Sequence, residues 1–202
     1  EACRRLGYAP EFRQIVWENK DVYLSIGQVD CLWGSFTMTG REDLYQWAGP
    51  YLYSRQVVAV RTDSGIQTLA DLAGRRVAVQ ATGKPESIFL TSDAPGIAQV
   101  EAVYSFSTMD EVYACLRKGY ADAIAGHENA LGLFLASSPG SYRMLDETLD
   151  MSQLGVAFQK DTHQELAQAL TQTLVEMEAD GTTRAILERY GLDADRALGV
   201  TP

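Results

Sequence analysis

Residues 30–51 read DCLWGSFTMTGREDLYQWAGPY, and they decide how the chain is interpreted. Residues 29–33 predict a short apolar strand. Small and hydroxylated residues follow it, and then comes a single cation, Arg41. A loop at the carboxyl end of a buried strand is where open α/β sheets bind ligands, and a planar guanidinium suits a carboxylate. An exposed arginine beside an ordinary loop is the alternative interpretation of this stretch.

Composition limits the partners that the chain can have. Its 202 residues suffice for one large domain or two small lobes. An apolar content of 46% with 22% charged residues is typical of a soluble globular protein. The net charge of −10 argues against nucleic acid and anionic membranes as partners. No apolar run approaches the roughly 20 residues of a membrane helix. No signal peptide is recognised, which fits a cytoplasmic chain, a mature chain or an excised piece.

The cysteines predict neither a metal site nor a disulfide scaffold. Cys3, Cys31 and Cys115 form no CxxC or Cys/His pattern. Cys31 and Cys115 lie in apolar segments, so we expect buried thiols. No serine, cysteine or carboxylate stands at a spacing that indicates a nucleophile and its base. We therefore expect no cofactor, no metal and no catalytic residue.

Glycine-bounded apolar segments predict an alternation of helices and strands. The expected strands are residues 11–16, 29–33, 56–61, 75–80, 102–105, 121–125, 142–145 and 154–158. The expected helices are residues 1–6, 21–27, 69–74, 108–118, 128–136, 164–179 and 183–190, with another beginning near Pro85. This order at short spacing predicts α/β architecture with parallel strands.

Three candidate sites directly follow predicted parallel strands. They are Gly34 to Arg41, Thr82 to Lys84, and His127 with Glu128. The helix that begins near Pro85 has free N–H groups at its start, so Thr82 and Lys84 border a plausible anion site. Because loops at the carboxyl edge of a sheet face the same way, we expect a small-molecule site, within a cleft if there are two sheets.

The order of these motifs resembles the solute-binding proteins of the polar amino-acid uptake family, which have the type 2 periplasmic-binding fold. The similarity covers nearly the whole chain. It rests on Asp30 through Val60 and on three phrases: LADLAGRRVAVQATG (69–83), LRKGYADAIAGHENA (116–130) and EMEADGTTRAILERYG (176–191).

The resemblance implies two Rossmann-like lobes with parallel-dominated sheets, joined by crossover strands near residues 56–61 and 154–158. Lobe I would comprise residues 1–58 and 155–202, and lobe II residues 59–154. Family members begin with a strand that this sequence lacks. Either the sequence is a fragment, or the gap in lobe I is filled by rearrangement or by another chain, as in a strand-exchanged dimer.

The resemblance also implies a set of ligand-binding residues. In lobe I they are Trp17 as an aromatic wall, Gly34, Ser35, Phe36 and Thr37 as backbone and hydroxyl contacts, and Arg41 as the carboxylate clamp, although the loop before Arg41 is one residue shorter than usual. In lobe II they are Gln80, Thr82, Gly83 and Lys84 as an anion site, with His127 where the family has an acid for an α-ammonium group, followed by Glu128. A neutral histidine cannot supply a carboxylate's charge. Either Glu128 turns toward the ligand, or the ligand lacks an ammonium group.

The resemblance implies a non-enzymatic, extracytoplasmic module. It would bind a small carboxylate-bearing solute, an amino acid or an analogue, in the inter-lobe cleft for uptake by an ABC transporter, with the permease as partner. One alternative is the ligand-sensing domain of a membrane receptor, with signalling domains in the same chain. Another is a dehydratase-like enzyme on the same fold, since fold alone does not determine function.

Overall fold

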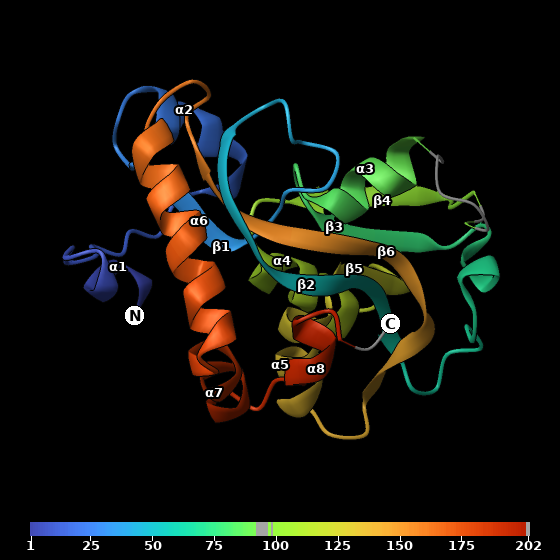
Figure 1. Ribbon diagram of the computed structural model, residues 1–202. Helices are drawn as coiled ribbons and strands as arrows, with labels where there is room; N and C mark the ends of the chain where they lie inside the picture. The colour runs from blue at the N-terminus through green and yellow to red at the C-terminus, as the bar shows by residue number, and fades with distance from the viewer. Residues whose placement is uncertain (92–96, 98, 201–202) are drawn as a thin grey trace. The chain divides into compact units, whose positions relative to one another are not determined.

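The computed structural model describes residues 1–91, 97 and 99–200, and Figure 1 traces them. Its strands are β1 (Cys31–Thr37), β2 (Gln46–Arg61), β3 (Arg76–Gln80), β4 (Ala102–Phe106), β5 (Ala123–His127) and β6 (Tyr142–Phe158). Its α-helices are α1 (Ala2–Arg5), α2 (Lys20–Ser25), α3 (Lys84–Thr91), α4 (Met109–Arg117), α5 (Glu128–Ala136), α6 (Gln164–Ala179), α7 (Thr182–Arg189) and α8 (Ala194–Ala197). Two 3₁₀ helices, η1 (Trp17–Asn19) and η2 (Leu69–Leu72), complete the elements.

The strands form one mixed six-stranded sheet in the order β1-β6-β2-β5-β3-β4. β3 pairs in parallel with both β4 and β5. β1 pairs antiparallel with β6, and β2 pairs antiparallel with β5. The prediction of parallel-dominated sheets is therefore correct only for β3, β4 and β5. It is wrong for the pairs of β1 with β6 and of β2 with β5, which are antiparallel.

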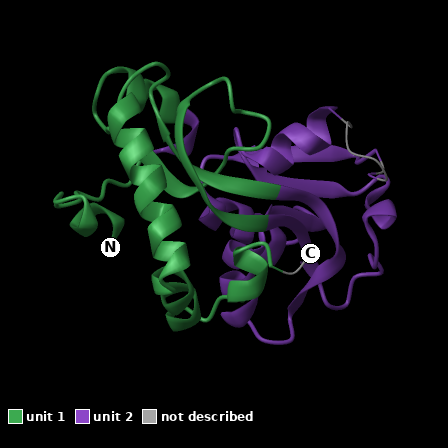
Figure 2. Ribbon diagram, viewed as in Figure 1, with its two compact units in different colours: residues 1–15, 19–54, 152–202 green, residues 16–18, 55–151 purple. Residues whose placement is uncertain are grey.

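The chain divides into two compact units, coloured separately in Figure 2. Unit 1 comprises residues 1–15, 19–54 and 152–202, and unit 2 comprises residues 16–18 and 55–151. β2 and β6 each contribute residues to both units.

The strand expected at residues 11–16 does not form. The sheet contains no strand from this segment, and the Phe12 side chain is 93% exposed. Arg13 donates a side-chain hydrogen bond to the carbonyl of Gln28. A single extended segment without a strand beside it leaves its backbone groups to water, so apolar composition alone does not make it a strand.

Strands β1, β2 and β6 extend well beyond their predicted bounds. β1 continues through Thr37 instead of ending at Trp33, and its register against β6 shifts between Leu32 and Phe36. Ser35 has a φ of 55° within this irregularity. β6 is one strand where two were expected. Antiparallel pairing and a β-bulge carry these strands through polar residues that end an apolar pattern.

The core of unit 2 has one apolar layer on each face of the sheet. Successive residues of β2 alternate between them, as strand geometry requires. Val58 packs in the layer that contains Leu72 of η2 and Phe89 of α3. Val57 packs in the layer that contains Leu116 of α4 and Leu131 of α5. The sheet is thus covered on both faces, and its strand ends remain for the loops.

The core of unit 1 is built by α6 against β6. The buried residues Ala167, Leu170, Leu174 and Met177 recur at helical spacing and pack with Val156 of β6. In the same unit the rings of Phe36, Tyr45 and Trp47 form a cluster with centroids 5.1–5.3 Å apart.

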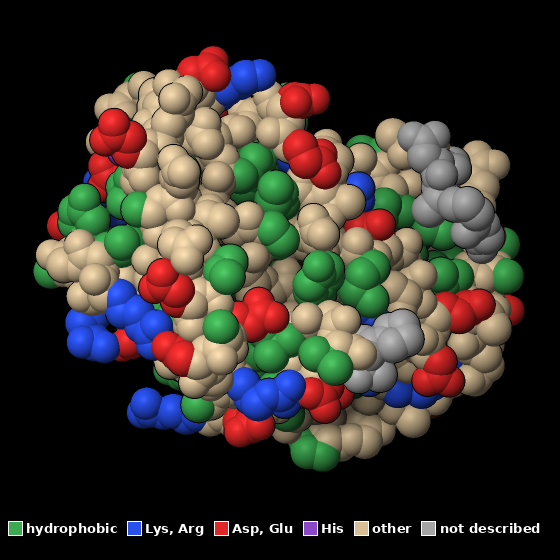
Figure 3. Space-filling view, in the orientation of Figure 1, with side chains coloured by type: hydrophobic (Ala, Val, Ile, Leu, Met, Phe, Trp, Pro, Cys, Tyr) green, Lys and Arg blue, Asp and Glu red, His purple; other side chains and the backbone are tan. Residues whose placement is uncertain are grey.

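No helix among residues 1–91 and 99–200 is long and apolar enough to cross a bilayer. On the face drawn in Figure 3, acidic and basic side chains are interspersed. This face therefore offers no continuous basic surface of the kind that binds nucleic acid.

We predict that Gly155→Ala destabilises the protein by about 1–3 kcal/mol, the usual cost of overpacking. A Cβ atom at position 155 would lie 2.7 Å from the Trp47 ring. The matched control is Gly132→Ala in α5, whose Cβ would meet its nearest neighbour at 3.7 Å. That variant should be neutral or gain up to about 1 kcal/mol of helix propensity. Urea unfolding measures both, and equal effects would contradict the prediction.

A second prediction concerns the ion pair that ties β3 to the residue before β5. Arg76 donates to both carboxylate oxygens of Asp122, at 2.8 and 3.0 Å, and lowers the pKa of Asp122. A lowered pKa stabilises the fold above the unfolded value of about 3.9, and the contribution is lost as the pH falls through the folded pKa. Asp122→Asn should therefore lower the Tm at pH 7, with a gap that closes in acid. The control variant Asp43→Asn, at an exposed position, should leave the Tm at pH 7 unchanged.

Candidate functional site

Three loops of unit 2 lie at one edge of its sheet. Since β3 is parallel to β4 and β5, the carboxyl ends of all three strands point the same way. Gln80 pairs with Phe106 in register, and Ala78 pairs with Ile124. β3 and β4 then pass through short loops into α3 and α4, and β5 passes directly into α5. The structure thus places the predicted residues of the β3–α3 loop and of the β5–α5 junction at the same edge.

The turn from β3 into α3 is tightly built. Thr82 has a φ of 57°, and a Cβ atom on Gly83 would lie 2.8 Å from the carbonyl oxygen of Gln80. Only glycine fits there without moving the backbone. The amide of Thr82 donates to Oε2 of Glu86 at 2.6 Å. The helix start predicted as an anion site, with Lys84 as its first residue, therefore already contacts one carboxylate of the chain itself.

The loop after β4 receives a segment that is distant in sequence. Gln80 donates its side-chain amide to the carbonyl of Ser107 at 3.2 Å. The hydroxyl of Ser107 donates to Oε2 of Glu18 at 2.6 Å. Glu18 follows the half-buried Trp17 in η1. Trp17, expected at the end of a strand in lobe I, belongs instead to residues 16–18, which are part of unit 2.

At the junction of β5 and α5, two residues pair with side chains of β2. Gln56 lies opposite His127 in register, and its amide nitrogen is 3.1 Å from the ring nitrogens of His127. Arg55 forms a bidentate pair with Glu128 at 2.6 and 2.9 Å, which raises the pKa of Arg55. The exposed fractions of these two side chains are 23% and 19%. A carboxylate held in this way has its charge neutralised locally.

In unit 1, Arg41 is positioned by the residues that precede it. Its Nη1 donates to the carbonyl of Thr37 at 3.3 Å, and its guanidinium carbon lies 5.4 Å from the centre of the Phe36 ring. Its own carbonyl accepts from Trp47 Nε1 at 3.0 Å. Burial lowers the pKa of Arg41 from its ordinary value. The result is a half-buried cation held in one place.

The residues predicted before Arg41 differ in exposure. Phe36 and Thr37 are 1% and 2% exposed, so their side chains support the loop from inside. Gly34 and Ser35 are exposed at the bulge of β1. Of this group, only the bulge presents its backbone to solvent.

Sequence reasoning missed Arg55, Gln56, Glu18 and Ser107. Arg55 and Gln56 lie in an apolar strand whose partner and register are unknown from sequence. Glu18 and Ser107 meet only in the folded chain. The one local signal was Glu18 itself, a charged residue directly after the predicted aromatic wall.

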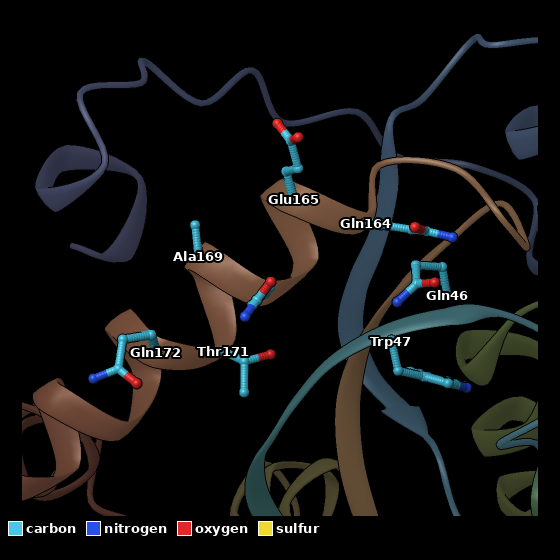
Figure 4. A pocket seen from close by; sticks show the side chains of 8 residues that line it. Gln46, Trp47, Gln164, Glu165, Ala169, Thr171 and Gln172 are labelled. Carbon is cyan, nitrogen blue, oxygen red and sulfur yellow. The ribbon is translucent and has the colours of Figure 1, made fainter.

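Unit 1 also contains a groove of 770 Å³ between the start of β2 and α6. In Figure 4, Gln46 and Gln164 extend toward one another, whereas Glu165 points away from them. Amide side chains at residues 164, 168 and 172 follow the helical spacing on α6. The lining contains no lysine or arginine, so the groove has no cation for a carboxylate.

Within the described residues there is no group of three or more His, Cys, Asp or Glu side chains that could hold a metal ion. The loops at the edge of unit 2 supply hydrogen-bond donors and acceptors, and the end of β1 supplies a cation. These arrangements can bind a polar solute.

Comparison with known proteins identifies the family. The chain is 26% identical to the glutamine-binding protein of Geobacillus stearothermophilus over 75% of its own length and 56% of the relative's. It is 26% identical to the glutamate-binding protein GluB of Corynebacterium efficiens over 95% of its own length and 66% of the relative's. The crystal structure of Tv2483 bound to L-arginine superimposes with a TM-score of 0.86 at 26% identity, over 100% of this chain and 81% of the other.

The chain spans 56–66% of the length of these two curated relatives. The family model of the bacterial extracellular solute-binding proteins, family 3, matches residues 1–193. The chain therefore belongs to this family of solute-binding proteins.

Proposed function

We propose that the chain binds a polar amino acid, or a close carboxylate-bearing analogue, as the solute receptor of an ABC uptake transporter outside the cytoplasmic membrane. Support comes from the family match over residues 1–193 and from the solutes of the similar proteins, namely glutamine, glutamate and L-arginine. The permease of the transporter would be its protein partner.

The single observation that carries the proposal is the arrangement of Arg41. A guanidinium can bind a carboxylate through two parallel N–H···O bonds, but only if its plane is held still. The Phe36 ring and the carbonyl of Thr37 contact the guanidinium. The indole N–H of Trp47 donates a hydrogen bond to the backbone carbonyl of Arg41. Because the cation is half-buried, its attraction to an anion is screened less than on an open surface.

The remaining predicted residues supply polar groups to the same solute in this proposal. Gly34 and Ser35 would offer backbone groups at the bulge of β1. At the edge of unit 2, the polar groups would come from Gln80, Lys84 and His127. The proposed lobes are residues 1–58 with 155–202, and residues 59–154.

We predict that one or more of glutamine, glutamate and L-arginine raises the thermal stability of the purified protein. A ligand at 100 times its Kd adds about 2.7 kcal/mol to the free energy of unfolding. Differential scanning fluorimetry ranks the ligands, and calorimetry gives the Kd. Arg41→Ala should weaken the best ligand by about 100-fold or more, since each of the two charge-assisted hydrogen bonds lost contributes about 1.5–3 kcal/mol.

The matched control is Arg4→Ala in unit 1, since Arg4 is exposed and pairs with Glu1. It should leave the Kd unchanged. Binding by none of the three amino acids would count against the proposed function. Tight binding that survives Arg41→Ala would remove Arg41 from the site and leave the function standing.

A further inference from the structure

The turn that begins at Arg41 is closed by backbone hydrogen bonds. The amide of Arg41 donates to the carbonyl of Met38 at 2.9 Å, and the amide of Leu44 donates to the carbonyl of Arg41 at 3.0 Å. These bonds fix the backbone of Arg41, but its long side chain keeps several rotatable bonds. The orientation of the guanidinium therefore depends on the side chains around it.

Tyr45 directly follows this turn and packs against two residues that contact Arg41. Its ring meets the Phe36 ring edge-on, with centroids 5.1 Å apart and planes at 75°, and the Trp47 ring at 5.3 Å and 71°. Such edge-to-face pairs are favourable beyond the area they bury. Phe36 contacts the guanidinium, and Trp47 donates to the carbonyl of Arg41. The position of the Tyr45 ring thus constrains both contacts.

The hydroxyl of Tyr45 is held from α2. It donates to Oδ1 of Asp21 at 2.5 Å, a distance typical of a hydroxyl bound to a charged carboxylate, which is stronger than a neutral hydrogen bond. Burial, together with Asp21, raises the pKa of Tyr45, so the hydroxyl stays protonated at neutral pH and donates. Asp21 lies in the first turn of a helix that contacts β1, so the hydroxyl is tied to a second element of unit 1.

Asp21 and Tyr45 also act on the charge of Arg41. Burial lowers the pKa of Arg41, and both side chains oppose that lowering. Arg41 in turn opposes the rise in the pKa of Tyr45. The three side chains therefore interact as one group, with an exposed carboxylate at one end and a half-buried cation at the other.

We propose that Tyr45, anchored by Asp21, is a positioning residue that holds the Arg41 guanidinium in the orientation in which it binds the carboxylate of the solute. The inference rests on the proposed function, since it concerns the same carboxylate contact. Tyr45 and Asp21 act through Phe36 and Trp47 and do not themselves touch the solute. A guanidinium oriented in advance loses less side-chain freedom when the solute binds, which strengthens binding without any new contact.

The first test is Tyr45→Phe, which keeps the ring and removes only the hydroxyl. Calorimetry would use whichever of glutamine, glutamate and L-arginine binds the unaltered protein most tightly. We expect the affinity to fall about 5-fold or more, within the range of couplings between residues of one network. The matched control is Tyr23→Phe in α2, since the Tyr23 hydroxyl has no hydrogen bond to the described part of the chain. This control should leave the affinity unchanged.

A double-mutant cycle separates positioning from a general loss of structure. In the Arg41→Ala background the guanidinium is absent, so Tyr45→Phe should change the affinity by less than about 2-fold. NMR titration would follow these weaker complexes. A purely structural role of Tyr45 would give the same loss in both backgrounds.

Two variants of Asp21 separate its charge from its hydrogen bond. Asp21→Asn keeps a carbonyl oxygen that can accept from the Tyr45 hydroxyl, so it should retain most of the affinity. Asp21→Ala removes the acceptor and should reproduce the loss seen in Tyr45→Phe.

NMR relaxation of the Nε–H group of Arg41 tests the same restraint in the unliganded protein. Arg41→Ala identifies the signal because it removes it. We expect a restrained group in the unaltered protein and in Tyr23→Phe. In Tyr45→Phe the order parameter should fall below about 0.6, the range of flexible groups.

The outcomes are distinct. An unchanged affinity in Tyr45→Phe, or the same loss with and without Arg41, overturns the inference while the proposed function stands. Tight binding that survives Arg41→Ala overturns the inference as well. If the unaltered protein binds none of the three amino acids, the proposed function fails, and the order parameter of Arg41 alone decides whether Tyr45 and Asp21 restrain the guanidinium.

Discussion

Parallel hydrogen bonding of β3 with β4 and β5 is the constraint on which the rest of unit 2 depends. It turns three strand ends to one edge, and each strand must then return through a helix that begins there. Three helix starts bring three sets of unsatisfied N–H groups to the same place. Each of these helices has a glutamate in its first turn, and in α5 that glutamate pairs with Arg55. A surface rich in polar groups results, but most of these groups are already used internally.

Much of this architecture could be predicted from the sequence, and the reasons are local. The bounds expected for α5 and α6, 128–136 and 164–179, are confirmed, because apolar residues recur along both helices and Gly181 follows the end of α6. The expected cores of β3, β4 and β5 are confirmed within two residues. The strand at residues 11–16 was wrong because a strand needs a neighbour, which no local pattern provides. The strands β1, β2 and β6 extend beyond the apolar segments that predicted them. Hydrogen bonds to an antiparallel partner keep their polar residues in the strand.

The predicted binding residues also divide into those that local sequence patterns indicate and those that depend on tertiary contacts. Gly83 could be placed from its position after a strand, and the structure adds the reason for it, a carbonyl too close for any side chain. Arg41 could be named, but its support from Phe36 and Trp47 could not, because that support depends on a ring cluster formed by two strands. Arg55 and Glu18 escaped notice because their roles are set by register and by a contact between residues 18 and 107. Local patterns indicate which residues could bind, and tertiary contacts decide which remain available.

Gly155 lies against the Trp47 ring, and the indole of Trp47 in turn holds the carbonyl of Arg41. A position far along the chain is thereby mechanically linked to the guanidinium without touching it. Among homologues this linkage should leave an evolutionary trace. Where position 155 acquires a side chain, position 47 should shrink in compensation, and the loop that carries the arginine should diverge with it. Paired substitution at 47 and 155 would then be one route by which such receptors change their solute preference while the binding residues themselves stay the same.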